Sequence, residues 1–360
     1  MCADAITRAA QAEAPISGAR ADRPALRFGV FDWVDDSGKP VAQIYDERLT
    51  LAEAADKAGL FCYHIAEHHC TPLGLAPSPN VFLAALATRT RRIRLGPLVA
   101  LLPLYEPLRL VNEIAMLDHL SHGRLELGIG KGVSPYELGY HGVDAGDTGQ
   151  VFAETLDILR AAWTQQRLTA GGTHTLRYQD VPLPLRPLQQ PHPPLWCPTA
   201  SPDTASWAAS QSINLMGLGP AENFAACARA FWRSRSGTTT AVVGMNRHIV
   251  VAPTDAEAVR TARDAFPRFA DNFAKLWEQH GNPRVRPMVD FDANLAHGTI
   301  IAGSPATVRA ELARQADTAH LNYFSLAFAW GDLPLQRALR SLHLFAEHVL
   351  PTVSGTPVRG

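Results

Sequence analysis

The stretch that decides the fold is residues 95–132, LGPLVALLPLYEPLRLVNEIAMLDHLSHGRLELGIGKG. Its first apolar run ends at Pro103, as expected for a buried strand. Apolar residues then recur at three- and four-residue spacing from Leu108 to Leu120, which predicts an amphipathic helix. Gly123 suits the left-handed position that ends a helix, and a second apolar strand then runs into GIGKG. The stretch therefore predicts one strand–helix–strand unit of a parallel sheet.

The same alternation continues through the rest of the chain. Counting gives about eight strands, each followed by a helix, which at this length is typical of an α/β protein with a (β/α)8 TIM barrel. An open doubly wound sheet fits less well, because the strands show no division into two halves. The expected strands are 27–33, 60–66, 93–102, 125–130, 195–198, 213–218, 241–252 and 321–330. The expected helices are 48–59, 79–90, 108–120, 150–165, 201–210, 221–235, 255–279, 304–317 and 335–350.

We expect one barrel domain over residues 27–355. Residues 1–26 contain no apolar core of the kind found in signal peptides, and we expect them to form a flexible N-terminal tail. Two segments interrupt the alternation and are predicted to be insertions. Residues 167–194, with Gly171-Gly172 and six prolines, suggest a surface hairpin, and residues 280–298 suggest an unstructured lid.

The overall composition excludes some classes of partner. The 360 residues include 46% hydrophobic and 19% charged residues, and the net charge is -1. This balance gives no general attraction to nucleic acid or to an anionic membrane, and no apolar run reaches the ~20 residues that span a bilayer. The five cysteines form no CxxC pair and indicate reduced thiols in a cytoplasmic protein.

A carboxylate and two histidines, Glu67-His68-His69, follow directly after an expected strand. The carboxyl ends of strands are where parallel barrels place their catalytic groups. A histidine titrates near neutral pH and can serve as a general acid or base. The preferred interpretation is therefore proton-transfer chemistry at this site.

Two alternatives remain for this segment. Cys62, His64 and Cys70 lie nearby, so a metal site is conceivable, although the HExxH pattern is absent. The histidines could also form a purely structural, hydrogen-bonded pair. No metal is expected in the preferred interpretation.

The sequence also suggests an anion site. GIGKG lacks the third glycine of a dinucleotide fingerprint, because Val133 stands there, and Pro135 argues against an immediate helix. We instead expect the loop to admit a ligand phosphate, with Lys131 as its counter-charge. Ser201-Pro202 begins a helix beyond the next strand, and its free N–H groups could bind the same phosphate.

Taken together, several blocks resemble the bacterial luciferase-like family of flavin-dependent monooxygenases. In chain order they are AEHH (66–69), SPNVFLAALATRTRRIRLGPLV (78–99), LLPLYEPLRLVNEIAMLDHLSHGRLELGIGKG (101–132), TASPDTASWAA (199–209), GSPATVRAEL (303–312) and LHLFAEHVLP (342–351). The fold of that family is a (β/α)8 barrel, in agreement with the strand count.

The resemblance implies roles for the Glu67-His68-His69 segment and its surroundings. The first histidine of the family's EHH segment is catalytic, which is His68 here, and Glu67 and His69 would line the same pocket. The family's non-proline cis peptide would fall at Leu98-Val99. Residues 280–298 coincide with the family's mobile active-site loop, and Glu106 stands where the family usually has histidine.

The resemblance also implies the phosphate contacts of FMN. The basic residue of the glycine-rich loop is Lys131, at a position where the family prefers arginine, and Gly130 precedes it. Ser201 and Thr204, next to Ala200, would bind the same phosphate. A second family arginine is replaced by Gln150, which weakens one expected contact.

The implied function is an FMN-dependent monooxygenase. Reduced FMN would come from a separate flavin reductase, since no segment resembles an NAD(P)H domain. With O2 it would give a C4a-peroxyflavin that oxidises a small or medium apolar organic substrate, such as an aldehyde or a ketone. A homodimer formed by helices beside the opening strands is expected. The alternatives are F420-dependent hydride transfer and a flavin-binding protein without catalysis.

Overall fold

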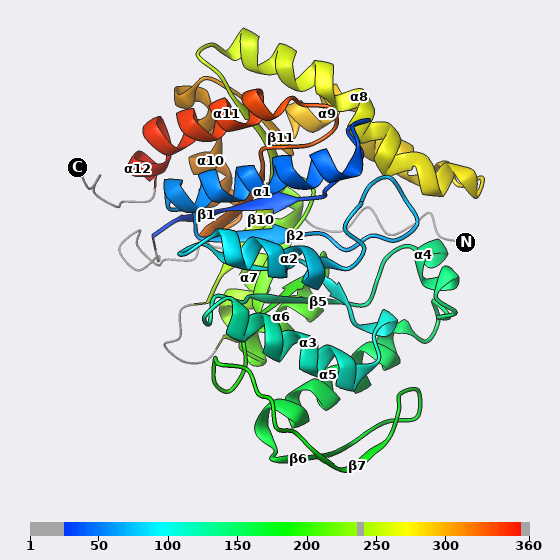
Figure 1. The fold of residues 1–360 in the computed structure, drawn as a ribbon. Coiled ribbons are helices and arrows are strands. Elements are labelled where there is room, and N and C mark those ends of the chain that lie inside the picture. Colours follow the sequence, from blue (N-terminus) through cyan, green and yellow to red (C-terminus); the bar gives the residue numbers. More distant parts are fainter. Residues whose placement is uncertain (1–24, 236–240, 354–360) are drawn as a thin grey trace.

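The computed structural model describes residues 25–235 and 241–353 of the chain. Nine parallel strands form a ring, in the order β3-β2-β1-β12-β10-β9-β8-β5-β4 (Figure 1). They occupy eight barrel positions, because β3 and β4 are successive parts of one interrupted strand. Their bounds are β1 Arg27–Asp32, β2 Cys62–Ile65, β3 Arg94–Pro97, β4 Ala100–Leu101, β5 Leu127–Gly130, β8 Leu195–Pro198, β9 Asn214–Gly217, β10 Val243–Val251 and β12 Tyr323–Ala327.

The ring closes between β3 and the residues just before β5. Leu95 N donates to the carbonyl oxygen of Arg124 at 3.0 Å, and Glu126 N donates to the carbonyl oxygen of Leu95 at 2.8 Å. The prediction of a (β/α)8 barrel is confirmed. A further strand, β11 (Ile300–Gly303), pairs with the C-terminal half of β10 outside the ring and was not predicted.

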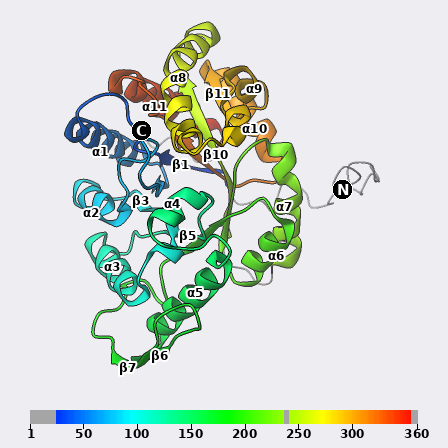
Figure 2. The same ribbon diagram turned by 90° about the vertical axis from the view of Figure 1, so that its right-hand side faces the viewer.

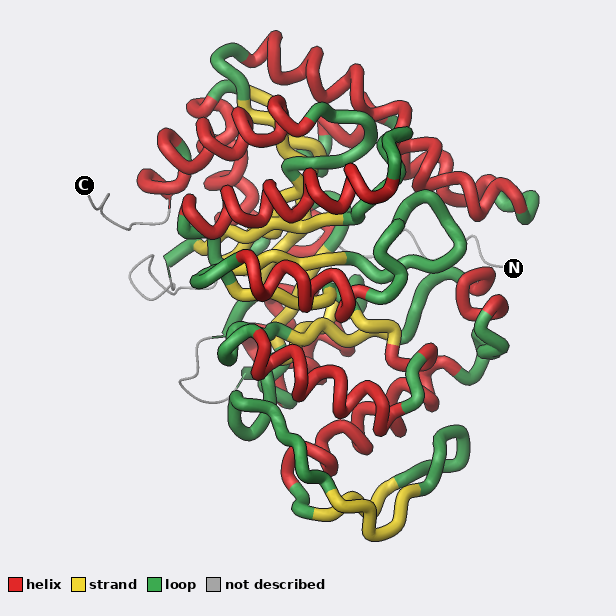
Figure 3. Tube along the Cα trace, viewed as in Figure 1, coloured by secondary structure: helices red, strands yellow, loops and turns green. Residues whose placement is uncertain are grey.

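Helices surround the strands on the outside of the barrel (Figures 2 and 3). Their buried faces carry the apolar residues whose spacing predicted them, such as Leu110, Val111 and Ile114 of α3. The main helices are α1 Val41–Ala58, α2 Pro79–Arg89, α3 Pro107–Leu120, α5 Thr148–Thr164, α6 Pro202–Ser210, α7 Ala221–Ser234, α8 Asp255–Gln279, α10 Pro305–Thr318 and α11 Leu335–His348. Shorter ones are α4 Pro135–Tyr140, α9 Phe291–Ala296, α12 Leu350–Val353 and the 3-10 turns η2 Leu102–Leu104 and η3 Pro283–Val289.

Several local signals act as predicted. Gly59, the last residue of the helix expected at 48–59, follows α1 with φ 77°, and Gly123 follows α3 with φ 75°, both in the left-handed region. Ser201 is the N-cap of α6, where its hydroxyl accepts a hydrogen bond from Thr204 N at 3.4 Å. Ser201 thus fixes where α6 begins after β8, at the barrel mouth, whereas the two glycines fix where α1 and α3 end, at the opposite end of the barrel.

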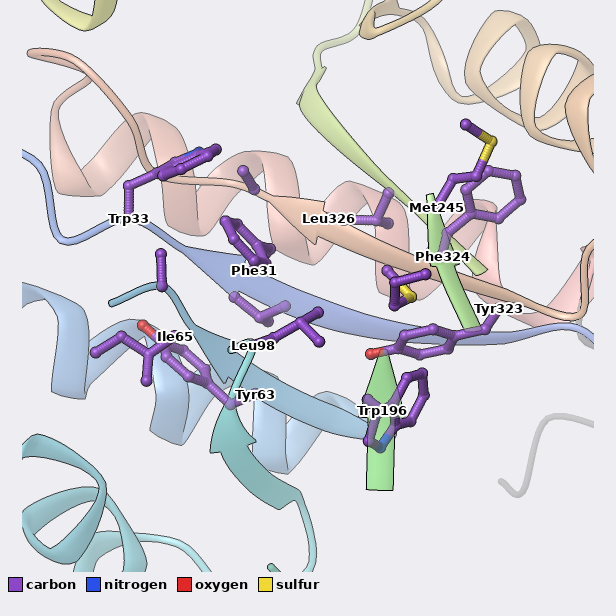
Figure 4. Close-up of a cluster of buried hydrophobic side chains, with 14 of the residues drawn as sticks. Phe31, Trp33, Tyr63, Ile65, Leu98, Trp196, Met245, Tyr323, Phe324 and Leu326 are labelled. Carbon is purple, nitrogen blue, oxygen red and sulfur yellow. The ribbon is translucent and has the colours of Figure 1, made fainter. Parts of the chain in front are cut away.

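Large side chains fill the barrel interior. Tyr63, Trp196 and Tyr323 are fully buried, and the rings of Trp196 and Tyr323 lie 5.3 Å apart. Leu98 lies among the interior side chains (Figure 4). The barrel is therefore a packed core rather than a pore, and a ligand must bind at one of its ends.

The structure corrects several predicted boundaries. Residues 280–298 are not unstructured, because they contain η3 and α9. Pro135 does not prevent a helix, since it occupies the first position of α4. The strand expected at 93–102 is interrupted between β3 and β4 and ends in η2, and α1 begins at residue 41 rather than 48.

The remaining domain predictions have mixed outcomes. Residues 167–194 do contain a hairpin, β6 (Arg167–Ala170) with antiparallel β7 (Tyr178–Pro182), which lies away from the barrel in Figure 1. The expected tail, residues 1–26, lies almost entirely outside the described residues. Among the described helices, none is both long and apolar enough to cross a membrane.

Candidate active site

Three loops from different strands bring their side chains together around His68. His68 follows β2, Glu137 lies in α4 after β5, and Trp33 follows β1. Nδ1 of His68 lies 3.3 Å from both carboxylate oxygens of Glu137. The indole of Trp33 stacks on the imidazole of His68, with centroids 5.6 Å apart and planes 24° from parallel. The imidazole is therefore oriented by a carboxylate on one side and an aromatic face on another.

Glu67 and His69 form a second pair with a different arrangement. Oε1 of Glu67 lies 2.8 Å from Nε2 of His69, and Oε2 accepts hydrogen bonds from Leu101 N and Tyr105 OH, both at 2.9 Å. Burial, and then the charge of Glu67, raises the pKa of Tyr105, so this phenol stays protonated and donates. Glu67 thus ties the loop after β2 to the end of β4 and to the loop after η2.

A small pocket opens beside these pairs. Its apolar walls are Leu101, Val133 and Leu138, and His68 and two carboxylates also line it. The lining comes from the ends of three neighbouring barrel positions, and its full membership is Glu67, His68, Leu101, Gly132, Val133, Ser134, Glu137 and Leu138. His68 therefore faces an apolar space at the carboxyl ends of the strands.

An aromatic wall stands next to His68. Trp33 contacts the imidazole of His248 on β10 in a stacked arrangement at 6.4 Å, and His248 packs edge-on against Phe269 of α8 at 4.4 Å and Trp330 at 5.1 Å. Burial, helped by the charge of Arg247, lowers the pKa of His248 to about 3, so this ring is neutral near pH 7. The wall is thus apolar and uncharged, and its ring nitrogens Trp33 Nε1, His248 Nε2 and Trp330 Nε1 have no hydrogen-bond partner among the described residues.

The predicted phosphate residues lie at the ends of two adjacent strands. β5 pairs with β8 through Leu127 and Gly128, so Lys131 after β5 and Ser201 after β8 extend from neighbouring positions. Lys131 is exposed and takes part in no ion pair among the described residues. Thr204 is partly buried in the first turn of α6. Both halves of the expected clamp are therefore available at one edge of the mouth.

The glycines of GIGKG have a packing role that their sequence did not reveal. The peptide bond between Leu98 and Val99 is cis, where the resemblance placed it. A Cβ on Gly130 would lie 2.4 Å from Cγ2 of Val99, and one on Gly128 would lie 2.5 Å from the carbonyl oxygen of Pro97. Glycine is required here because the interrupted strand approaches the backbone of β5 closely.

Other residues that were predicted from the sequence do not line the pocket beside His68. Gln150, in the first turn of α5, and Ala200 are exposed, and no side-chain hydrogen bond of Gln150 occurs among the described residues. His64 is fully buried, 3.8 Å from Sγ of Cys62, and burial lowers its pKa to about 3. Within residues 25–235 and 241–353, no three histidine, cysteine, aspartate or glutamate side chains gather as a metal site would require.

Glu137 and Trp33 were not predicted from the sequence as site residues. Glu137 lies 69 residues from His68 in the chain, between the strand expected at 125–130 and the helix expected at 150–165, where neither a helix nor a strand was expected. The available signal was the Ser134-Pro135 pair, because serine followed by proline starts other helices of this chain, and a helix there would have drawn attention to its acidic residue.

Comparisons with known proteins place these features in a family. A family model described as luciferase-like monooxygenase matches residues 26–320. The uncharacterized protein y4wF of Sinorhizobium fredii is 44% identical over 322 residues, covering 87% of this chain and 93% of that protein. The oxygenase component of the flavin-dependent trigonelline monooxygenase of Acinetobacter baylyi is 32% identical over 195 residues, 53% of each chain.

Solved structures share the barrel. Monooxygenase RslO1 from Streptomyces bottropensis has a TM-score of 0.83 at 27% identity, covering 91% of this chain and 99% of its own. At lower identity the likeness concerns the fold alone. The oxygenating constituent of 3,6-diketocamphane monooxygenase of Pseudomonas putida, solved with FMN, has a TM-score of 0.76 at 20% identity, covering 93% and 100%. The F420-dependent tetrahydromethanopterin reductase of Methanopyrus kandleri has 0.70 at 15%, covering 91% and 99%. By its sequence and its fold, this chain belongs to the luciferase-like monooxygenase family and is a flavin-dependent oxidoreductase.

Proposed function

We propose that the protein is an FMN-dependent monooxygenase that oxidises a small or medium apolar organic substrate, such as an aldehyde or a ketone, in the pocket beside His68. The observation that carries this proposal is the imidazole of His68, which Glu137 and Trp33 hold at the edge of an apolar pocket. A histidine in this position can serve as a general acid or base.

The donor set at the mouth fits FMN. A phosphate monoester needs charge compensation and hydrogen-bond donors, and Lys131, Ser201 and Thr204 offer an ammonium group, hydroxyl groups and the first N–H groups of α6. These three residues would hold the phosphate, with Gly130 and Ala200 beside them. Leu98 and Val99 at the cis peptide bond would help to hold the ring system, and Gln150 would give a weaker phosphate contact than the arginine that the family has at this position.

The residues of this chain would divide the remaining tasks. FMN, when bound in its reduced form, supplies the electrons that activate O2. Leu101, Val133, Leu138 and the aromatic wall would exclude water and receive an apolar substrate. His68 would hold or move a proton at Nε2, the ring nitrogen that Glu137 leaves unoccupied. Glu67 and His69 would keep the loop of His68 in place.

We also propose a separate flavin reductase as partner. A relative is named as the oxygenase component of a monooxygenase, which implies that another component supplies the reduced flavin there. The described cysteines Cys62, Cys70, Cys197 and Cys227 are all free thiols, which favours a cytoplasmic location.

A homodimer through α2 and α3 is a further part of the proposal. The two helices are neighbours, and each exposes large apolar side chains, with Val81 72%, Met116 54% and Leu120 48% exposed. Light scattering of the purified protein at several concentrations would test it, and Met116→Glu should shift a dimer towards the monomer.

One titration distinguishes this function from its main alternative. The protein is mixed without oxygen with reduced FMN or with reduced F420, and air is then admitted in the presence of candidate aldehydes and ketones. Tight binding of reduced FMN and oxygen uptake coupled to product support the monooxygenase. Tight binding of F420 alone would overturn it in favour of hydride transfer.

The same assay tests the alternative that the protein binds flavin but catalyses no reaction. His68→Ala should bind reduced FMN as the wild type does and should lose at least a hundredfold in product formation, which is the lower range for a removed acid or base. Product formation at the wild-type rate would exclude His68 from the chemistry. A wild type that binds FMN but forms no product from any candidate would favour a flavin-binding protein.

A further inference from the structure

Glu137 contacts both the side chain of His68 and the backbone of His69. Both carboxylate oxygens lie 3.3 Å from Nδ1 of His68, and Oε2 also accepts a hydrogen bond from the backbone N–H of His69 at 2.9 Å. The residue is only 5% exposed. The carboxylate therefore contacts the side chain of one histidine and the backbone of the next, and it fixes both the ring and the loop that carries it.

The chemistry of the pair decides which nitrogen of His68 carries the proton. Burial raises the pKa of Glu137, but the hydrogen bond and charge of His68 and the N–H of His69 outweigh burial and keep it below its usual value. The carboxylate is therefore ionised near pH 7 and can only accept hydrogen bonds. Nδ1 of His68 must be the donor, and no described residue hydrogen-bonds to Nε2.

We propose that Glu137 is a positioning residue, which holds His68 in the tautomer protonated at Nδ1 and so leaves Nε2 to exchange protons in the pocket. This inference rests on the proposed function for the catalytic meaning of His68, but the tautomer itself can be measured independently. A buried carboxylate that orients an imidazole is an established way of setting its tautomer in other enzymes.

The position of Glu137 depends on contacts between α4 and the residues that follow α8. The helix α4 has six residues, and a helix this short is not stable in isolation. Tyr136 stacks on His280, just after α8, at 4.0 Å and 6° from parallel, and its hydroxyl accepts a hydrogen bond from Asn282 Nδ2 at 3.1 Å. Tyr140 OH lies 2.8 Å from Nε2 of His280. These contacts, which we term the α4 clasp, connect the end of α8 to the carboxylate that orients His68.

Three variants test the proposal. Glu137→Gln keeps the size of the side chain but places an amide, with N–H donors, where only acceptors stood. Glu137→Asp keeps the charge and shortens the side chain. Glu53→Gln removes a carboxylate of comparable size from α1, where it pairs with Arg89 at 2.5 Å, and serves as the matched control.

The first measurement is nuclear magnetic resonance of protein labelled with 15N in histidine, without any flavin. The signals of His68 are assigned from their disappearance in His68→Gln. We expect the Nδ1–H form to dominate in the wild type and in Glu53→Gln, to fall below half in Glu137→Gln and to return in large part in Glu137→Asp. An unchanged His68 tautomer in a folded Glu137→Gln protein would overturn the proposal. So would a wild type dominated by the Nε2–H form.

The second measurement follows hydrogen peroxide release when protein loaded with reduced FMN meets air. Loss of an orienting partner of this kind changes activity by about 10- to 100-fold in metal sites. We therefore expect the rate of hydrogen peroxide release in Glu137→Gln to differ from the wild-type rate by a factor of this size, with the affinity for reduced FMN unchanged. Equal rates in wild type and Glu137→Gln would contradict the positioning role. If the wild type bound no reduced FMN, the proposed function would fail, while the tautomer measurement would still decide the role of Glu137.

Discussion

The phosphate clamp can be tested by comparing two ligands that differ only in the phosphate. Lys131 is exposed and pairs with no described carboxylate, so replacing it should not disturb the fold. If its ammonium group contacts the phosphate of FMN, then Lys131→Ala should weaken binding of FMN and leave binding of riboflavin, which has no phosphate, unchanged. The difference between the two ligands isolates the charge from any indirect effect on the ring site.

The expected size follows from the exposure of Lys131. A hydrogen bond to a charged group contributes about 1.5–3 kcal/mol when it is shielded from water, whereas an exposed ion pair contributes at most about 1 kcal/mol. Because Lys131 is exposed, we expect a loss near 1 kcal/mol, which corresponds to about a fivefold weaker affinity for FMN. The loss should shrink at high salt, since exposed charges are screened.

The assay is a fluorescence titration of the protein with each ligand at low and high salt. The control is Lys57→Ala, which removes another exposed lysine, from the last turn of α1. The reasoning would be refuted if Lys131→Ala weakened FMN and riboflavin equally, or if Lys57→Ala matched its effect on FMN. Lys131→Arg should bind FMN at least as tightly as the wild type, because a guanidinium can contact two phosphate oxygens.

Three further predictions concern the barrel and the loops at its mouth. Gly96→Ala should lower the free energy of unfolding by at least ~2 kcal/mol in urea titrations, because the added Cβ would lie 1.6 Å from a backbone carbonyl oxygen beside β5. In the control Gly149→Ala, the added Cβ would have no atom within 4 Å, and the free energy of unfolding should not change. In Glu137→Gln, the free energy of unfolding should fall less steeply below about pH 4.5 than in the wild type. A carboxyl group whose pKa is lowered by folding contributes stability above its unfolded pKa, and this contribution disappears as the pH falls. The same decrease in both proteins below about pH 4.5 would contradict this. Tyr136→Ala removes the stack on His280, so chymotrypsin should cut after Tyr140 at least several-fold faster than in the wild type, and equal cutting rates would show that the α4 clasp does not hold this segment.

The barrel could be predicted from the sequence because its signals are local. The apolar period of α3, the serine cap of α6 and the glycines after α1 and α3 each act within a few residues, and the structure confirms them. Alternation of such elements leaves few topologies besides a barrel. What failed were short elements next to prolines. Pro135 was interpreted as arguing against a helix and residues 280–298 were expected to be unstructured, but Pro135 and Pro283 each occupy the first turn of a helix, where proline needs no N–H partner.

The site was less predictable because its contacts are distant in the chain. His68 was identified from its neighbours and from the family resemblance, but its carboxylate partner is in α4 and its aromatic partner follows β1. No periodicity connects residues 33, 68 and 137, and only the closed ring of strands brings their loops together. The cis peptide bond at Leu98-Val99 likewise came from the resemblance, because no local pattern of residue types marks it.

The sequence Glu67-His68-His69 reads as one catalytic unit, but the structure divides it between two tasks. Glu67 uses both oxygens within the protein, on His69 and on Leu101 and Tyr105, so its carboxylate is committed to holding the loop. His68 contacts Glu137 instead, and of the two histidines it is the one that lines the pocket. The proton transfer proposed for His68 needs one ring nitrogen held and the other unoccupied, and among the described residues Glu137 contacts Nδ1 whereas no side chain hydrogen-bonds to Nε2.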